Sequence, residues 1–227
     1  MTSFTRTARN RVESLTWVQR AFLGAALILF VYVRWQTDTL DERVVHDVLL
    51  YIVGPLALGL THGRRIGWTV DRKALRNTLL LALFVLPFYI VGSSLPSIRT
   101  FYPLWETTLA PGDFVPHAIK LFLLALATET YFRGLLCVGV RELGPKAVFV
   151  SPVVYALMHH GKPPIELALS GPTDVLFGAV DYASDSILPS VIAHGCGLVL
   201  LDYLVLRPPV FPPEAVLRWL QWVPVPL

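Results

Sequence analysis

Charged residues are scarce in this chain: they make up 15% of its 227 residues, against about 25% in an average soluble domain. Cysteine is nearly absent, and the two that occur, Cys137 and Cys196, form neither a CxxC redox motif nor a metal-binding knuckle. The sequence also has no HExxH motif, no internal repeat and no low-complexity tract. These absences argue against a dithiol oxidoreductase, a zincin protease and a repeat protein.

Apolar residues dominate instead, at 54% of the chain, and the mean hydropathy is +0.58. This balance indicates a polytopic membrane protein, with residues 1–227 forming a single membrane domain. The formal net charge of +3 does not indicate a nucleic-acid partner, because the basic residues lie mostly between apolar runs. In that position Lys and Arg report membrane topology.

A helix that spans a bilayer needs about 20 mostly apolar residues. By this measure the sequence predicts an all-α, polytopic transmembrane helix bundle of about six to eight membrane helices. A short amphipathic helix over 213–222 would lie on the membrane surface, with Trp219 and Trp222 at the interface. The predicted spans are 17–35, 46–62, 77–96, 116–140, 147–160, 164–181 and 187–206.

The segments between these spans alternate in charge. The N-terminal tail, 1–16, and the segments 63–76 and 141–146 are basic, whereas 36–45 and 97–115 are not. The alternation predicts a cytoplasmic N-terminus. The first apolar run continues into Arg34-Trp35 with no small-residue cleavage site, so we interpret it as an uncleaved first membrane helix.

Two opposite charges lie inside the central apolar run, from about His117 to Val140. Glu129 and Arg133 are four residues apart, so they share one face of a helix. A structural ion pair would account for them, yet buried pairs stabilise poorly compared with apolar residues. Ionisable side chains within a membrane segment are therefore also candidates for a functional site.

Histidines occur in two further apolar segments. Tyr155, His159 and His160 end the predicted span 147–160, and His194 lies about two turns into the span 187–206. Imidazole can act as a base, an oxyanion donor or a metal ligand. A single histidine of this kind is more often a hydrogen-bonded core residue, or one at the lipid–water boundary.

Two carboxylates accompany these histidines. Glu166 follows the run Gly161-Lys162-Pro163-Pro164, and Asp202 lies eight residues after His194, roughly on the same side of that helix. Because none of these polar side chains faces lipid cheaply, we expect them to converge on one polar intramembrane cavity.

The order of these residues resembles the CAAX-protease and bacteriocin-processing family of glutamic intramembrane proteases. Its members carry a Glu-Glu-x-x-x-Arg motif, then Phe-x-x-x-His, then His-x-x-x-Asn, each on a membrane helix. Glu129 matches the second Glu and Arg133 the Arg. Tyr155 stands in for the Phe, while His159 and His194 match the two histidines.

The resemblance covers residues 116–206 and implies that this stretch is the catalytic core. Two positions depart from the pattern: Thr128 replaces the first Glu, and Leu198 replaces the final Asn. In the family the first Glu is the usual base for the attacking water, and the His and Asn side chains stabilise the oxyanion. The family has no required metal, and its bacterial branches are consistent with a multi-pass protein of a prokaryotic cytoplasmic membrane.

The resemblance leads to the hypothesis of an endopeptidase without a covalent intermediate. Glu129, held ionised by Arg133, or alternatively Glu166, would deprotonate a water. His159 and His194 would position that water or donate to the oxyanion, and the cavity would be reached from the cytoplasmic half. The substrate would be a peptide or a membrane-anchored protein. The secondary candidates for the site are His160, Glu166, Asp202, Tyr155 and Thr128.

Three alternatives stay open from the sequence. Thr128 and Leu198 favour a catalytically silent family member that binds a partner helix in the membrane. A zinc site would use Glu129, His159 or His160, and His194. A transporter would also explain intramembrane acids, although no inverted repeat is present.

Overall fold

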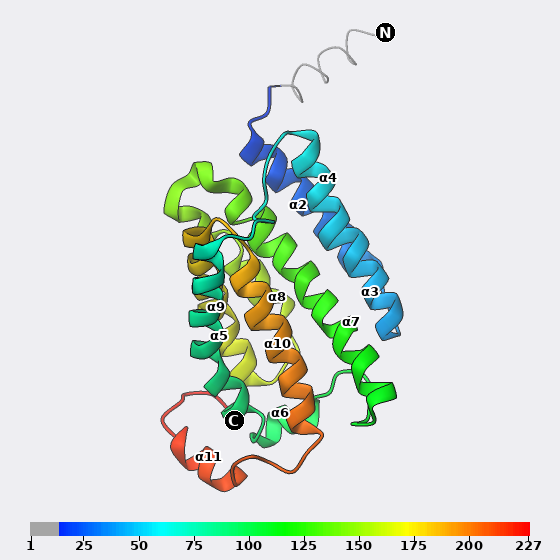
Figure 1. The fold of residues 1–227 in the computed structure, drawn as a ribbon, viewed down its shortest axis with the longest axis vertical. Coiled ribbons are helices and arrows are strands. Elements are labelled where there is room, and N and C mark those ends of the chain that lie inside the picture. The colour runs from blue at the N-terminus through cyan, green and yellow to red at the C-terminus, as the bar shows by residue number, and fades with distance from the viewer. Residues whose placement is uncertain (1–13) are drawn as a thin grey trace.

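The computed structural model describes residues 14–227, and every regular element in that range is helical, which confirms the predicted all-α fold. The predicted basic tail, 1–16, lies almost wholly outside the described residues. Figure 1 shows the helices as an elongated bundle with most axes roughly along its long direction. The elements are α2 (Trp17–Arg34), α3 (Leu40–Asp47), the π-helical η1 (Val48–Val53), α4 (Gly54–Thr61), α5 (Arg72–Gly92), α6 (Pro96–Phe101), α7 (Pro111–Glu129), the π-helical η2 (Thr130–Leu135), the 3-10 segment η3 (Val138–Phe149), α8 (Pro152–Met158), α9 (Pro164–Ser184), α10 (Leu188–Val205) and α11 (Pro213–Trp219).

Two long apolar helical segments, α2 and the continuous α3–η1–α4, lie next to each other along one side of the bundle (Figure 1). Each begins with a threonine whose side chain caps the first turn. Thr16 exchanges hydrogen bonds with Gln19, and Thr39 does so with Glu42. Such capping boxes satisfy the free amides at a helix start, and here they set where both segments begin.

α10 is the central helix of the remaining bundle, where it packs along α5 and α7 and also contacts α9. The approach of α5 depends on a glycine, because a methyl group at Gly197 would overlap the ring of Tyr89. Gly195 likewise leaves room for the ring of Phe122 on α7. Small residues permit this close packing between membrane helices, where lipid supplies no hydrophobic drive for association.

The central apolar run does not form one straight helix, which corrects the predicted span 116–140. α7 passes directly into η2, and the chain then bends by 76° into η3. Within the π turn, the amide of Leu136 donates to the carbonyl of Tyr131, five residues back, at 3.3 Å. Such turns are rare in proteins and frequently lie at functional sites. This one directly follows Glu129.

Within residues 14–227, four helices are long and apolar enough to cross a membrane, or five if the bent pair α7–η2 and η3 counts as one span. This is fewer than the six to eight membrane helices that hydropathy predicts. The predicted span 147–160 is divided between η3 and the seven-residue α8. The predicted span 164–181 corresponds to α9, which carries three carboxylates. Short or polar helices of this kind bury their polar side chains against their neighbours.

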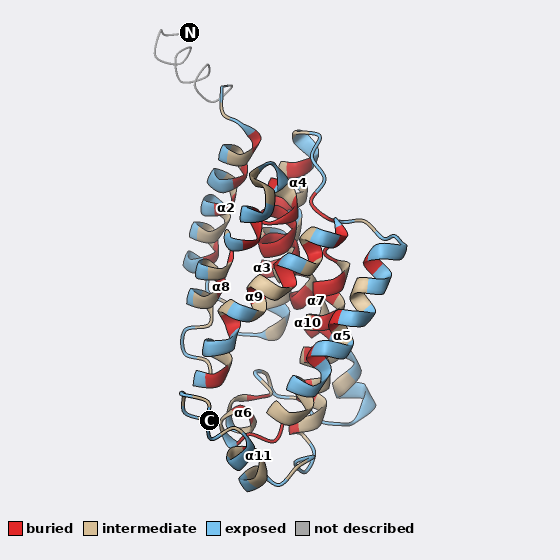
Figure 2. Ribbon diagram, turned by 90° about the vertical axis from the view of Figure 1, so that its left-hand side faces the viewer, coloured by how far each residue is buried: buried red, intermediate tan, exposed pale blue. Residues whose placement is uncertain are grey.

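The outer faces of the long helices are apolar and exposed. On α2, Leu23, Leu27 and Phe30 are 59%, 64% and 64% exposed. Figure 2 shows the same division across the bundle, with buried positions on inner faces and exposed positions on outer faces. Exposed apolar surface of this extent is typical of helices that contact lipid.

α6, α11 and the residues after α11 close the end of the bundle opposite the loop 62–71 (Figure 1). Val216 of α11 is fully buried against this end, whereas Trp219 and Trp222 are 52% and 76% exposed. The amphipathic helix predicted over 213–222 is therefore present as α11, and its exposed tryptophans suit a membrane interface.

Candidate active site

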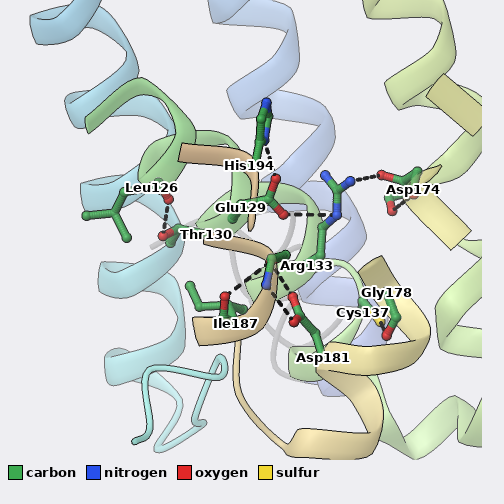
Figure 3. A network of polar contacts seen from close by, with 12 residues as sticks. Leu126, Glu129, Thr130, Arg133, Cys137, Asp174, Gly178, Asp181, Ile187 and His194 are labelled. Carbon is green, nitrogen blue, oxygen red and sulfur yellow. Dashed lines mark hydrogen bonds and ion pairs between the residues drawn. The ribbon is translucent and has the colours of Figure 1, made fainter. Parts of the chain in front are cut away.

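The ion pair that the sequence predicts lies at the junction of α7 and η2. Arg133 Nε is 3.0 Å from Glu129 Oε2, and neither side chain is exposed at all. A second carboxylate reaches the same guanidinium, since Arg133 Nη2 is 2.8 Å from Asp174 Oδ1 on α9. Figure 3 shows Arg133 between the two acids. Because removing one partner from such a group leaves a buried charge unpaired, the three side chains form a mutually dependent unit.

Aromatic rings and a hydroxyl complete the surroundings of this unit. The guanidinium carbon of Arg133 lies 4.4 Å from the ring centre of Tyr155 and 5.7 Å from that of Phe177. Ser151 donates to Asp174 at 2.6 Å. The aromatic faces and the two carboxylates fix the plane of the guanidinium, which a lysine at this position could not reproduce.

Asp174 is a member of this site that the sequence reasoning missed, and Asp181, one helical repeat later on α9, lies close by. Asp181 accepts hydrogen bonds from the amide and the hydroxyl of Ser190, the latter a very short contact. Both aspartates are fully buried. Their occurrence seven residues apart in an apolar helix is the signal that could have identified them, because acids inside a membrane helix face the bundle interior.

His194 joins the cluster from α10. Its Nδ1 lies 2.6 Å from Glu129 Oε1, so the two carboxylate oxygens of Glu129 are divided between His194 and Arg133. The carboxylate accepts a hydrogen bond from Nδ1–H, which fixes the ring and leaves Nε2 as the free nitrogen. In Figure 3 the His194 ring extends away from the cluster, with its second nitrogen remote from Glu129.

Next to this cluster lies a cavity of about 570 Å³ with mostly apolar walls from α5, α7, α9 and α10. The predicted cavity is therefore present, and charged and polar side chains interrupt its apolar walls. Glu129 and Arg133 do not line it, and His160 is exposed elsewhere. The predicted site residues that do line it are Thr128, Tyr155, His159, Glu166, His194 and Asp202, together with Leu198 at the position of the family Asn.

His159, at the end of α8, has a fixed orientation in this cavity. Its Nδ1 lies 2.8 Å from the backbone carbonyl of Tyr155, to which only a protonated nitrogen can donate. The free Nε2 then faces Glu166, with 3.9 Å between Nε2 and Oε1. That separation is too long for a direct hydrogen bond and leaves both atoms able to contact a shared water.

Glu166 is held by two other side chains. Lys162 Nζ lies 2.5 Å from Oε1, one helical turn away, and the Tyr102 hydroxyl donates to both carboxylate oxygens at 2.9 Å. Burial, and then the adjacent negative charge of Glu166, raise the pKa of Tyr102 well above its usual range. Tyr102 therefore stays protonated and keeps its role as a hydrogen-bond donor.

Asp202 lines the cavity near its far end and pairs with His117 of α7, with 2.7 Å between His117 Nε2 and Asp202 Oδ2. Both side chains are buried. The structure therefore places Asp202 on the same wall as His194, as the sequence predicts, but gives it a histidine partner that the sequence did not indicate.

The cavity lies in one half of the bundle, which determines the side of the membrane from which it is reached. Its wall on α5 runs from Phe84 to Gly92, at the end of that helix distant from the loop 62–71. The alternation of loop charges predicts that this basic loop is cytoplasmic, and the endopeptidase hypothesis from the sequence has the cavity reached from the cytoplasmic half. Those two expectations do not fit together, because the cavity lies in the half of the bundle away from the loop.

The zinc alternative requires Glu129, His194 and one of the adjacent histidines His159 and His160 around a single point. Among residues 14–227, no group of three or more His, Cys, Asp or Glu side chains is arranged to hold a metal ion.

The family profile described as type II CAAX prenyl endopeptidase Rce1-like matches residues 111–198, from the start of α7 into α10. This segment is similar to that family. The match confirms the resemblance drawn from the motifs, and it contains Glu129, Arg133, His159 and His194 in order. Comparisons with curated proteins and with solved structures gave no match.

The match of residues 111–198 to a family of membrane endopeptidases, together with helices apolar enough to span a bilayer, supports an integral membrane protein. The matched family is described as one of endopeptidases, which act on peptides or proteins. The matched range contains the two departures from the family pattern, Thr128 and Leu198, and both line the cavity.

Proposed function

We propose that this chain is an intramembrane endopeptidase that hydrolyses a peptide or a membrane-anchored protein with an activated water and without a covalent intermediate. One observation carries the proposal: His194 lines a cavity while its Nδ1 is bound to the buried carboxylate of Glu129. A histidine oriented by a carboxylate beside a substrate-sized cavity is a recurring unit of hydrolytic sites.

In this proposal Glu129 acts through His194. The sequence-based hypothesis makes Glu129 itself the base, but a base must reach the water, and Glu129 is fully buried behind His194. Nδ1 of His194 stays bound to Glu129, which is held in turn by Arg133, and Nε2 of His194 donates to the oxyanion that forms when the peptide carbonyl is attacked.

His159 has the complementary role. With Nδ1–H donated to the carbonyl of Tyr155, its Nε2 is an acceptor and orients the attacking water by accepting a hydrogen bond from it. Arg133 contacts neither water nor substrate in this scheme. It is a positioning residue that holds Glu129, and through Glu129 it holds His194.

The departures at Thr128 and Leu198 support a second candidate function. Where the family places a carboxylate and an amide, the cavity wall of this chain carries a hydroxyl and an aliphatic side chain. A catalytically silent protein that binds a transmembrane segment in the same cavity would need neither lost group. The buried charges argue against it, since a simple binding cavity gains nothing from an oriented histidine.

The test uses native membranes. Peptide termini in membranes that contain the wild-type chain are compared with those in membranes that contain the Glu129→Ala or the His194→Ala chain at equal abundance. We expect a set of new termini that depends on the wild type and is lost in both variants. Termini that persist in both variants would contradict the endopeptidase proposal and favour the binding function.

A further inference from the structure

The family pattern leaves one catalytic group of this chain unassigned. The first Glu of the family motif, its usual base, is Thr128 here, and Thr128 lines the cavity without supplying a carboxylate. The adjacent Glu129 has both oxygens engaged and does not line the cavity. If water is activated in this site, the proton must therefore be taken by another group.

Three carboxylates line the cavity within residues 14–227: Asp47, Glu166 and Asp202. Asp47 is 2% exposed and is held by Arg43 at 2.8 Å and by His46 at 2.7 Å. Those partners lie on α3, remote in sequence from the histidines of the family motifs.

Asp202 is equally inaccessible, with its side chain 3% exposed and bound to a buried histidine. Glu166 differs from both in two respects. Its side chain is 21% exposed, and its nearest histidine, at 3.9 Å, is His159, a residue of the family motif. Of the three acids, Glu166 is therefore the one that can meet a water at the catalytic histidines.

The separation between His159 Nε2 and Glu166 Oε1 suits a shared water. Two polar atoms 3.9 Å apart can each lie about 2.8 Å from one water placed at the apex of a triangle. Such a water would donate one hydrogen bond to each atom. It would point its lone pairs into the cavity, where a peptide carbonyl would be bound.

We propose that Glu166 is the general base of this protein and has taken the place of the carboxylate that Thr128 lacks. This assignment rests on the proposed endopeptidase function. Glu166 removes a proton from the water as the water oxygen bonds to the peptide carbonyl carbon. The protonated Glu166 then delivers that proton to the leaving nitrogen as the carbon–nitrogen bond breaks, so that one water and one peptide give a carboxylate and an amine.

Lys162 and Tyr102 are positioning residues in this step. The ammonium of Lys162, 2.5 Å from Oε1, holds that oxygen of Glu166 in place. The hydroxyl of Tyr102 contacts both oxygens and holds the carboxylate plane toward His159. Tyr102 comes from the segment after α6, outside the range 111–198 matched by the family, so the base is supported by a part of the chain that the family pattern does not cover.

The experiment compares Glu166→Gln, Thr128→Glu and the double variant, with cleavage of the membrane proteins identified for the wild type as the measurement. We expect Glu166→Gln to lower the cleavage rate by about 10²–10⁴-fold, the usual contribution of a general base. The double variant should cleave at least about tenfold faster than Glu166→Gln alone, because Thr128→Glu returns a carboxylate to the cavity wall. The matched control, Glu214→Gln on the exposed face of α11, should retain the wild-type rate.

Two readouts separate catalysis from folding. Glu166→Asp keeps the charge and its partners but withdraws the carboxylate by one methylene, so it should fold as the wild type does and still cleave slowly. In a pH–rate profile, the cleavage rate of the wild type should fall at acidic pH as a carboxylate is protonated. The residual rate of Glu166→Gln should not show this acidic fall. A Glu166→Gln rate within threefold of the wild type, or an unchanged acidic fall, would overturn the assignment.

The outcome also separates this inference from the function on which it rests. Cleavage that His194→Ala abolishes and Glu166→Gln leaves intact would refute the role of Glu166 alone. Cleavage that survives both changes would refute the endopeptidase function and the inference together.

Discussion

Nδ1 of His194 lies 2.6 Å from Oε1 of Glu129, and this contact joins a fully buried charge cluster to a cavity that the cluster itself does not line. The histidine is thus the point at which the buried charges can influence a bound substrate. In the proposed reaction Glu129 does not reach the substrate itself and acts by fixing the ring of His194.

Glu129→Gln should impair cleavage more than substrate binding. The amide keeps the shape of the side chain but removes the carboxylate that orients His194 through Nδ1, so the oxyanion loses an oriented donor, at a cost of about 10²–10³-fold in rate. Kinetics on an identified substrate should show the loss in kcat with KM little changed. A rise in KM of about the same factor, with kcat unchanged, would instead indicate that Glu129 only shapes the cavity.

Arg133→Lys should destabilise the fold although it conserves the charge. An ammonium cannot reach Glu129 and Asp174 together while stacking on Tyr155, so one carboxylate is left unpaired at a cost of about 3–5 kcal/mol. Thermal unfolding in detergent measures the effect. The matched control is Arg141→Lys, whose ion pair with Asp185 is 40% and 69% exposed and should contribute at most about 1 kcal/mol.

Gly197→Ala should weaken the packing of α10 against α5. The added methyl group overlaps the Tyr89 ring, and overpacking of this kind costs about 1–3 kcal/mol. Gly112→Ala, where no atom lies within 4 Å of the added carbon, should be neutral or stabilising in the first turn of α7. Equal melting temperatures for the two variants would show that α5 and α10 are not held this closely in the membrane.

Cleavage should continue in the presence of metal chelators. The proposed reaction uses only side chains of this chain and water, and the described residues offer no group of three ligands for a metal. The measurement is the cleavage rate after incubation with a strong zinc chelator, followed by dialysis and re-addition of zinc. A rate that falls with the chelator and returns with zinc would restore the zinc hypothesis, with Glu129, His159 or His160, and His194 as its ligands.

The loop charges and the cavity position together predict on which side of the membrane the cavity opens. If the basic loop 62–71 is cytoplasmic, the cavity half of the bundle faces the other side. In a Cys196→Ala background, Leu104→Cys, at the cavity end, should react with a membrane-impermeant maleimide on intact cells. Arg65→Cys should react only after the cells are opened. The reverse result would place the N-terminus outside and the cavity toward the cytoplasm.

The sequence by itself determined the helical membrane character of this protein, the pairing of Glu129 with Arg133, and the order of the family motifs. These features are local: hydropathy over about 20 residues defines a span, and an i,i+4 spacing places two side chains on one face of a helix. The order of Glu129, Arg133, His159 and His194 along the chain was enough to name the family, because that order is a property of the sequence alone.

Only the tertiary structure decided which acid faces the cavity. Whether Glu129 or Glu166 meets water depends on the 76° bend after η2 and on how α8 and α9 return beside α10, and no local pattern encodes either. The same holds for Asp174, which lies 41 residues after Arg133 in the chain and becomes its partner only through helix packing. Local spacing supplies the charged groups, and helix packing determines which of them neutralise one another and which remain free to act.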